Sequence, residues 1–150
     1  MLGSKIVLKR RTPVRHLPLR LASGAHILDS GLAKLHADEE TTKRLHHFAS
    51  EAYPQAADVD PDSFVKALAA AEIALGGALV LPIVPSWLAG LGLAGFAGGL
   101  VHLYLRTPSL HREGGVLPNQ DGQAMAKDIW LLGIALALVL DRESWFRRRH

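Results

Sequence analysis

The sequence predicts an all-α fold, an integral membrane four-helix bundle with both termini in the cytoplasm. From Ile73 to Leu105 the chain runs for 33 residues without Asp, Glu, Lys or Arg. One helical span of a bilayer needs about 20 apolar residues, so this stretch is too long for one span. Pro82 and Pro85 lie in its middle, and prolines interrupt a helix. The stretch therefore predicts two spans joined by a tight turn.

The N-terminal part predicts a basic cytoplasmic tail, residues 1–16, followed by a first span at 17–37. The tail resembles the start of a signal peptide, but no small-residue cleavage site follows it, and we expect the span to be retained. Arg20, Asp29 and Lys34 make this span the least apolar of the four.

Residues 38–62 predict an acidic outer loop, with seven acidic against two basic residues. Within it, Thr41–Tyr53 predicts a short amphipathic helix, since apolar residues recur there at helical spacing. Asp60 and Pro61 predict an N-cap and a proline in the first turn of the second span.

The rest of the chain predicts three spans and a second basic tail. The spans are 63–81, 86–106 and 123–141, and the cytoplasmic tail is 143–150. Basic residues favour the cytoplasmic side of a membrane, so two basic tails require an even number of spans. Four spans satisfy this requirement and place the turn between Pro82 and Pro85 on the inner side.

Ionisable side chains inside the predicted spans form a candidate intramembrane polar network, because such groups are costly in a bilayer and usually face a partner. Its members are Arg20, His26, Asp29, Lys34, Glu72, His102, Arg106, Asp128 and Asp141. Their depths along the helices predict three charge pairs. On the inner side Arg20 is expected to pair with Asp141, and in the middle His26 with Asp29 or Glu72. Toward the outer side Lys34 or Arg106 is expected to pair with Asp128.

Simpler interpretations stay open for several of these residues. Arg20 and Arg106 can extend to the interfaces without a functional role. Asp128 can act as the acidic residue of a first helical turn. Glu72 can belong to a buried structural pair.

Glycines in the predicted spans are candidate helix-packing positions, because a missing side chain lets two helix backbones approach closely. They are Gly24, Gly31, Gly76, Gly77, Gly95 and Gly99. On the third span Gly95 and Gly99 share a face with His102, which predicts that His102 faces a neighbouring helix and not lipid.

The composition and motifs exclude several kinds of chemistry for this chain alone. It has no cysteine, which removes disulfides, thiolate metal sites and iron–sulfur clusters. We find no nucleotide-binding or nucleophile–base motif and predict no catalytic residue, metal site or cofactor of its own. The basic residues flank apolar segments without an aromatic-interleaved motif, so nucleic acid is not a predicted partner.

Four short motifs in order resemble the DoxX family of membrane proteins. Arg20 to Lys34 carries an Arg, two glycines and a Lys; Glu72 precedes Gly76 and Gly77; Asp128 precedes an apolar run; and Leu140-Asp141 closes the last span. The resemblance covers most of residues 15–142. It implies a four-helix membrane protein associated with oxidoreductase complexes, since one relative is a subunit of a thiosulfate–quinone oxidoreductase. Another, actinobacterial, relative is linked to a membrane assembly that joins a sulfurtransferase and a superoxide dismutase.

The leading functional hypothesis is a DoxX-like accessory or scaffold subunit, without catalytic activity, of a larger, redox-related or respiratory complex in the cell membrane. Its expected partners are the lipid bilayer and other subunits. The alternative is a small quinone- or lipid-handling protein with a polar pocket lined by His26, Asp29 and Glu72. A third hypothesis is an assembly factor that acts through the acidic loop, which deletion of residues 40–56 would test.

Overall fold

The computed structural model describes residues 12–141, and this part of the chain is all-α, as predicted. The helices are α1 (Leu17–Leu35), α2 (Glu39–Ala52), α3 (Pro61–Val80), α4 (Ser86–Arg106), α5 (Gly122–Ala126) and α6 (Ile129–Leu140). Residues 1–11 and 142–150 lie outside the described part. The predicted tails 1–16 and 143–150 therefore fall outside it, apart from residues 12–16.

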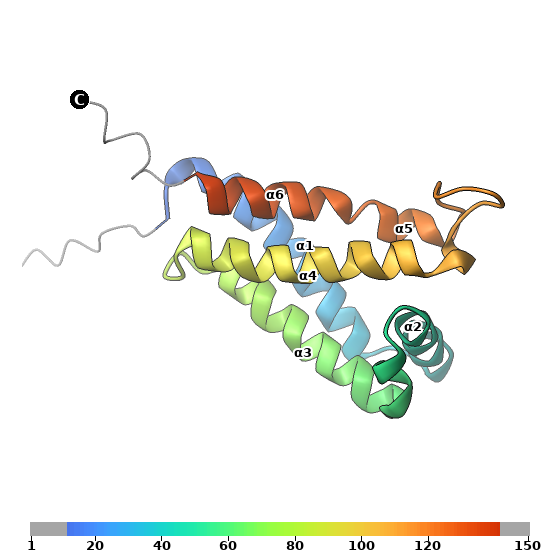
Figure 1. The fold of residues 1–150 in the computed structure, drawn as a ribbon. Helices are drawn as coiled ribbons and strands as arrows, with labels where there is room; N and C mark the ends of the chain where they lie inside the picture. Colours follow the sequence, from blue (N-terminus) through green and yellow to red (C-terminus); the bar gives the residue numbers. More distant parts are fainter. Residues whose placement is uncertain (1–11, 142–150) are drawn as a thin grey trace, which may run out of the picture.

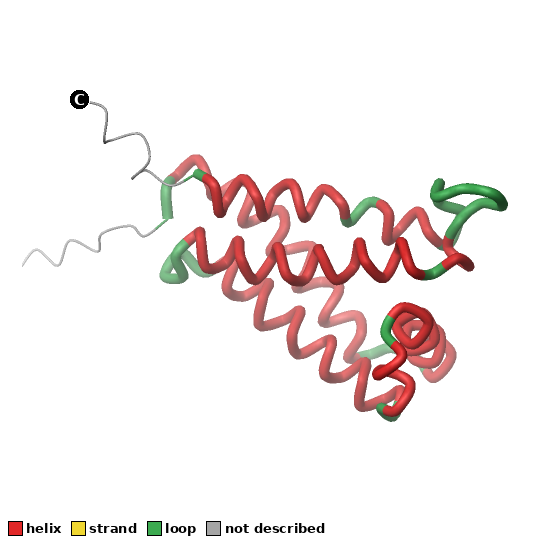
Figure 2. The backbone as a smooth tube through the Cα atoms, in the orientation of Figure 1, coloured by secondary structure: helices red, strands yellow, loops and turns green. Residues whose placement is uncertain are grey.

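Two helix pairs form a V. Helix α1 packs along α3, and α4 packs along α6. The pairs meet near the α3–α4 turn and diverge toward the opposite, wide end, where α2 lies across the opening (Figures 1 and 2). Thr12 and Asp141, the first and last described residues, both lie at the narrow end, where the Thr12 hydroxyl donates to the Pro82 carbonyl at 3.0 Å.

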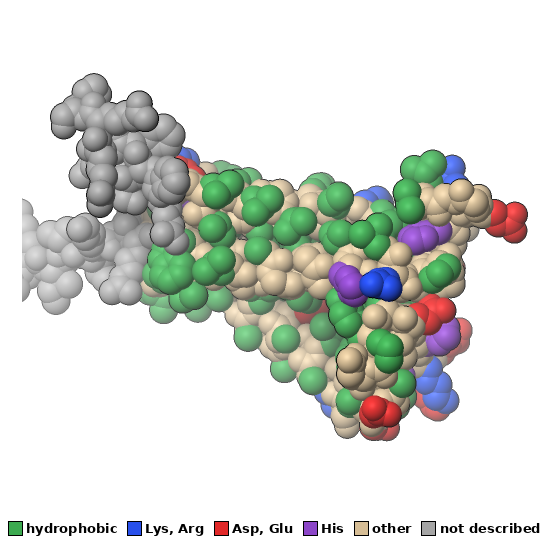
Figure 3. Space-filling view, in the orientation of Figure 1, with side chains coloured by type: hydrophobic (Ala, Val, Ile, Leu, Met, Phe, Trp, Pro, Cys, Tyr) green, Lys and Arg blue, Asp and Glu red, His purple; other side chains and the backbone are tan. Residues whose placement is uncertain are grey.

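Three helical segments are long and apolar enough to cross a membrane, which makes this a multi-pass helical membrane protein. They are Pro61–Val80, Ser86–Arg106 and Gly122–Leu140, the last formed by α5 and α6 together. Helix α1 is not among them; it carries Arg20, Asp29 and Lys34. The crossing of the membrane by the predicted first span therefore stays a prediction. Hydrophobic side chains spread over the α4 and α6 face, while charged ones gather at the wide end (Figure 3).

The helix starts follow the local sequence. Asp38 caps α2 by accepting from the Thr41 amide at 2.8 Å, and hydrogen bonds with Thr41 lower the pKa of this carboxyl. The predicted cap at Asp60 is confirmed, since its carboxylate accepts from the Ser63 amide at 3.0 Å and Pro61 opens α3.

The predicted fourth span is not continuous. Helix α5 ends at Ala126, a turn occupies residues 127–128, and α6 begins at Ile129 with Asp128 in the N-cap position. The turn keeps short-range hydrogen bonds, such as that from the Leu131 amide to the Asp128 carbonyl at 3.0 Å. The break falls at Lys127 and Asp128, but the mean hydropathy of the whole segment Gly122–Leu140 is still that of a membrane span, so hydropathy alone does not indicate it.

Glycines bring the backbones of α1 and α3 into close contact. A Cβ at Gly76 would lie 2.6 Å from Leu28 Cγ and 2.9 Å from the Leu28 amide nitrogen. A Cβ at Gly24 would lie 3.1 Å from the Gly76 carbonyl oxygen, and one at Gly31 3.0 Å from that of Ala69. These three glycines are therefore positions where a side chain would force the two helices apart.

Three other predicted packing glycines are corrected by the structure. A Cβ at Gly77 or Gly95 would meet no atom within 4 Å, and one at Gly99 would meet only the Tyr53 hydroxyl, at 3.7 Å. The glycine that brings α4 against α6 is instead Gly90, whose Cβ would lie 2.9 Å from Leu138 Cβ. Glycine content alone does not show which face of a helix meets a neighbour.

We expect Gly76→Ala and Gly77→Ala to have opposite effects. The first places a methyl group against the α1 backbone and should destabilise the fold by about 1–3 kcal/mol. The second places it in open space, where the higher helix propensity of alanine should leave stability unchanged or slightly raised. Thermal unfolding of both variants in detergent measures the difference, and equal midpoints would contradict close packing at Gly76.

Candidate functional site

Arg20 ties α1 to the α3–α4 turn at the narrow end. Its side chain is fully buried and donates only to uncharged oxygens. The acceptors are the carbonyls of Ala78, Leu79, Leu81 and Val84 and the hydroxyls of Thr12 and Ser86, at 2.7–3.1 Å. Four of these groups are carbonyls at the C-terminal end of α3 and in the turn, where the helix leaves acceptors without intrahelical donors.

The predicted pair of Arg20 with Asp141 is wrong. Asp141 instead accepts hydrogen bonds from Arg15 and, at 2.7 Å, lies against the His16 Nε2 atom. These two partners lower the pKa of the Asp141 carboxyl to about 2, Arg15 being the larger cause. Asp141 thereby connects the end of α6 to the start of α1. The spacing of charges along each helix gives depth only, and it does not show which basic residue near the start of α1 faces the end of α6.

Lys34 and Glu72 form a nearly buried ion pair between α1 and α3. The Lys34 Nζ atom lies 3.0 Å from Glu72 Oε2 and also donates to the Ser30 hydroxyl at 2.7 Å. The side chains are 16% and 3% exposed. The predicted partners, His26 for Glu72 and Asp128 for Lys34, are therefore exchanged in the structure.

His26 instead faces Asp128, with 3.7 Å between His26 Nε2 and the nearest carboxylate oxygen. Asp29 does not join it. The Asp29 side chain is exposed on the outer face of α1 and makes no hydrogen bond or ion pair with residues 12–141. Asp29 and His26 are three residues apart in α1, but only His26 turns toward α6.

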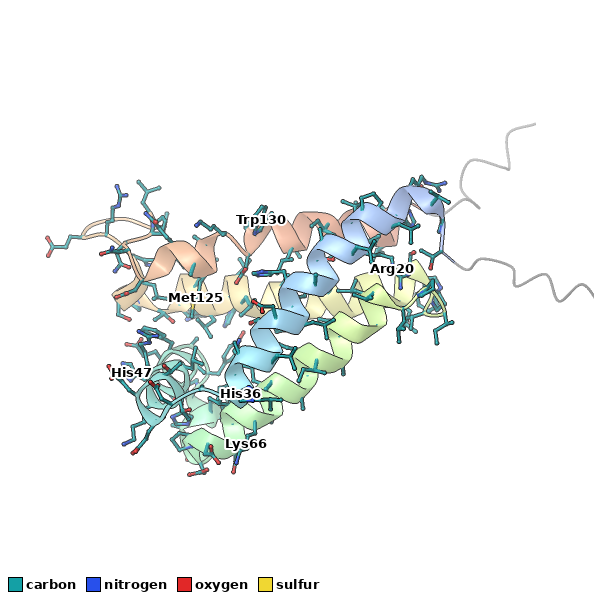
Figure 4. The ribbon with its side chains drawn as sticks, turned by 180° about the vertical axis from the view of Figure 1, so that it is seen from behind. Arg20, His36, His47, Lys66, Met125 and Trp130 are labelled. Atoms are coloured by element: carbon teal, nitrogen blue, oxygen red, sulfur yellow. The ribbon has the colours of Figure 1, made fainter. Side chains whose placement is uncertain are left out.

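A cavity of about 500 Å³ lies between the two helix pairs at the wide end. Polar groups of His26, Ser30, Lys34, Glu72 and Asp128 line one part of it. The rest is mainly apolar and includes Leu45, Ala49, Phe64, Leu68, Phe96, Leu100, Leu103, Met125 and Leu131. Met125 marks the α5 side of this region in Figure 4, while Arg20 lies at the far, narrow end. A volume of this size and an apolar lining with few polar groups are typical of small-molecule sites.

Helix α2 covers the cavity from the wide end. The apolar face predicted for Thr41–Tyr53 contributes Leu45 and Ala49 to the lining. At the end of α2, the Tyr53 hydroxyl donates to the Gly99 carbonyl at 2.9 Å and joins the helix to α4.

Five predicted network members lie outside the cavity: Arg20, Asp29 and Asp141, described above, and His102 and Arg106. His102 and Arg106 are exposed on α4, although the His102 ring also contacts the Tyr53 ring with centroids 5.2 Å apart. Conversely, sequence reasoning missed Ser30 and Tyr53 as site residues. Ser30 could have been found from the sequence, because it lies four residues before Lys34 and therefore on the same face of α1. No signal in the sequence places Tyr53 against Gly99.

Within residues 12–141 no group of three or more His, Asp or Glu side chains is arranged to hold a metal ion. The cavity and the candidate spans define a class: a multi-pass helical membrane protein with a partly polar cavity between its helices. Comparison with known proteins finds no family model, no curated protein and no solved structure that matches the chain. The DoxX resemblance therefore stays a prediction from the motifs alone.

Proposed function

We propose that this protein binds a small amphipathic molecule, such as a quinone or a lipid, in the cavity between its helix pairs. The observation that carries this proposal is the lining, which joins one cluster of charged groups to a larger apolar surface. Ionisable groups near the middle of a helical membrane protein commonly mark substrate or proton pathways. The proposed location is the cell membrane.

Filling the cavity tests this proposal. Gly95 lines the cavity and an added side chain meets no atom near its Cβ, so Gly95→Phe should occupy the space without disturbing the backbone. Gly98→Phe is the matched control, since Gly98 has similar room but does not line the cavity. We expect mass spectrometry of molecules co-purified with the protein to show at least a five-fold loss in Gly95→Phe only. Equal content in both variants would contradict binding in the cavity.

Asp29 favours a second function, that of an accessory subunit in a DoxX-like, redox-related membrane complex. This carboxylate lies near the middle of α1, on its outer face and without a partner in the described residues. If α1 crosses the membrane, exposure of a carboxylate to lipid is costly, and a second protein on this face would remove the cost.

Purification in mild detergent tests this second proposal. We expect a co-purifying protein whose yield falls in Asp29→Leu, and an unchanged yield in Ala25→Leu, a variant of the same exposed helix without a charge change. A wild-type chain that purifies alone would contradict the proposal.

A further inference from the structure

Asp128 lines the cavity, and its nearest charged partner is His26, which forms only a long ion pair with it. It occupies the N-cap position of α6, yet its side chain accepts no capping hydrogen bond. His26 Nε2, at 3.7 Å, is beyond hydrogen-bond distance. The Asp128 side chain is 17% exposed and lines the cavity, so its acceptor oxygens are mostly shielded from solvent and lie at the cavity wall.

Lys34 and Glu72, which also line the cavity, are paired at hydrogen-bond distance. Glu72 accepts from Lys34, and Lys34 also donates to Ser30. With His26 neutral, Lys34, Glu72 and Asp128 carry a formal charge of −1 together. A second negative charge near them would be repelled more strongly than in water, because the effective dielectric constant inside a protein is lower.

We propose that the cavity selects an amphiphile whose head group is a hydrogen-bond donor and is neutral or cationic, with Asp128 as the acceptor that determines this specificity. A hydroxyl or ammonium group supplies a short hydrogen bond to the Asp128 carboxylate, so among quinone-type ligands this selects the reduced quinol, whose hydroxyls donate. A carboxylate or phosphate head supplies none when ionised and adds to the negative charge. The apolar side chains, among them Phe96, Leu100 and Met125, surround the tail. This inference rests on the proposed function of the cavity.

Three eight-carbon probes that differ in their head group test this selectivity: octylamine, octanol and octanoate. Each is added to the full-length protein in detergent at pH 7. Binding is followed as the shift of the thermal unfolding midpoint with probe concentration. We expect octylamine to stabilise the wild-type protein at the lowest concentration, octanol at a higher one, and octanoate not at all.

Two variants with the same change of charge locate the effect. Asp128→Asn keeps the size of the side chain and removes its negative charge, and no capping hydrogen bond is lost because Asp128 makes none. We expect it to raise the half-maximal octylamine concentration at least ten-fold and to allow octanoate to stabilise the protein. Asp58→Asn removes an exposed carboxylate that does not line the cavity, and it should behave as the wild type.

The outcomes separate the inference from the function on which it rests. If the three probes stabilise the wild type equally, or if their order is the same in Asp128→Asn, Asp128 does not determine the head group, while the cavity can still bind amphiphiles. If no probe stabilises the wild type and Gly95→Phe changes no co-purified molecule, both proposals are wrong.

Discussion

Replacement of Arg20 by methionine should unfold the narrow end of the bundle. The variant keeps a long apolar stem but removes the six hydrogen bonds that Arg20 donates to four backbone carbonyls and two hydroxyls. Hydrogen bonds to a charged group contribute about 1.5–3 kcal/mol each, and buried acceptors left without donors are costly. Water can reach part of the turn and replace some of these donors, so the hydrogen bonds do not add up fully. We expect the free energy of unfolding to fall by about 3–5 kcal/mol.

Arg20→Lys refines this prediction. A lysine keeps the charge, but its three donors are on one nitrogen and cannot reach all the acceptors that the wider guanidinium group of Arg20 contacts. We expect Arg20→Lys to lose some stability, but less than Arg20→Met. Arg106→Met is the control, since Arg106 is exposed at the end of α4. Unfolding in detergent, followed by tryptophan fluorescence, measures all three, and similar midpoints for Arg20→Met and Arg106→Met would rule out the capping role.

The second large effect is expected at the Lys34–Glu72 pair. Lys34→Met leaves Glu72, only 3% exposed, without its counter-ion. Breaking a buried pair in this way typically costs about 3–5 kcal/mol. Glu72→Gln should cost less, because the amide oxygen still accepts from Lys34. The double variant Lys34→Met, Glu72→Leu should recover most of the stability, since an apolar pair of similar volume has no desolvation cost.

An exposed ion pair within α3 provides the comparison. Lys66 and Asp62 of α3 are 2.7 Å apart and both about two-thirds exposed. Because solvent screens such a pair, we expect no measurable coupling in the corresponding double-mutant cycle. Coupling of the same size in the two cycles would show that burial does not strengthen the Lys34–Glu72 interaction. Glu72→Gln also separates the two proposed functions: in a scaffold it should alter assembly, whereas in a binding cavity it should lower ligand affinity while the fold survives.

The charge pairs show where sequence reasoning stops. Residues at similar depth could be grouped from a rise of about 1.5 Å per residue, and the grouping placed Glu72 and Asp128 in candidate pairs. The partners themselves depend on how each helix is rotated and which helix lies beside it. Close contact at Gly24 and Gly76 sets α1 against α3 and turns Lys34 toward Glu72. His26 is then left beside the turn that ends α5.

The sequence by itself determined the helical class, the cap at Asp60 and the spans 63–81 and 86–106, since hydropathy, proline position and capping are local properties. Only the tertiary structure decided what Arg20 and Asp128 do. Arg20 donates to carbonyls of a turn about 60 residues away, and Asp128 lies in the break between α5 and α6 beside a cavity lined by residues of all six helices. Both environments result from helix packing, in which side chains far apart in the chain share one space, and no local pattern encodes that neighbourhood.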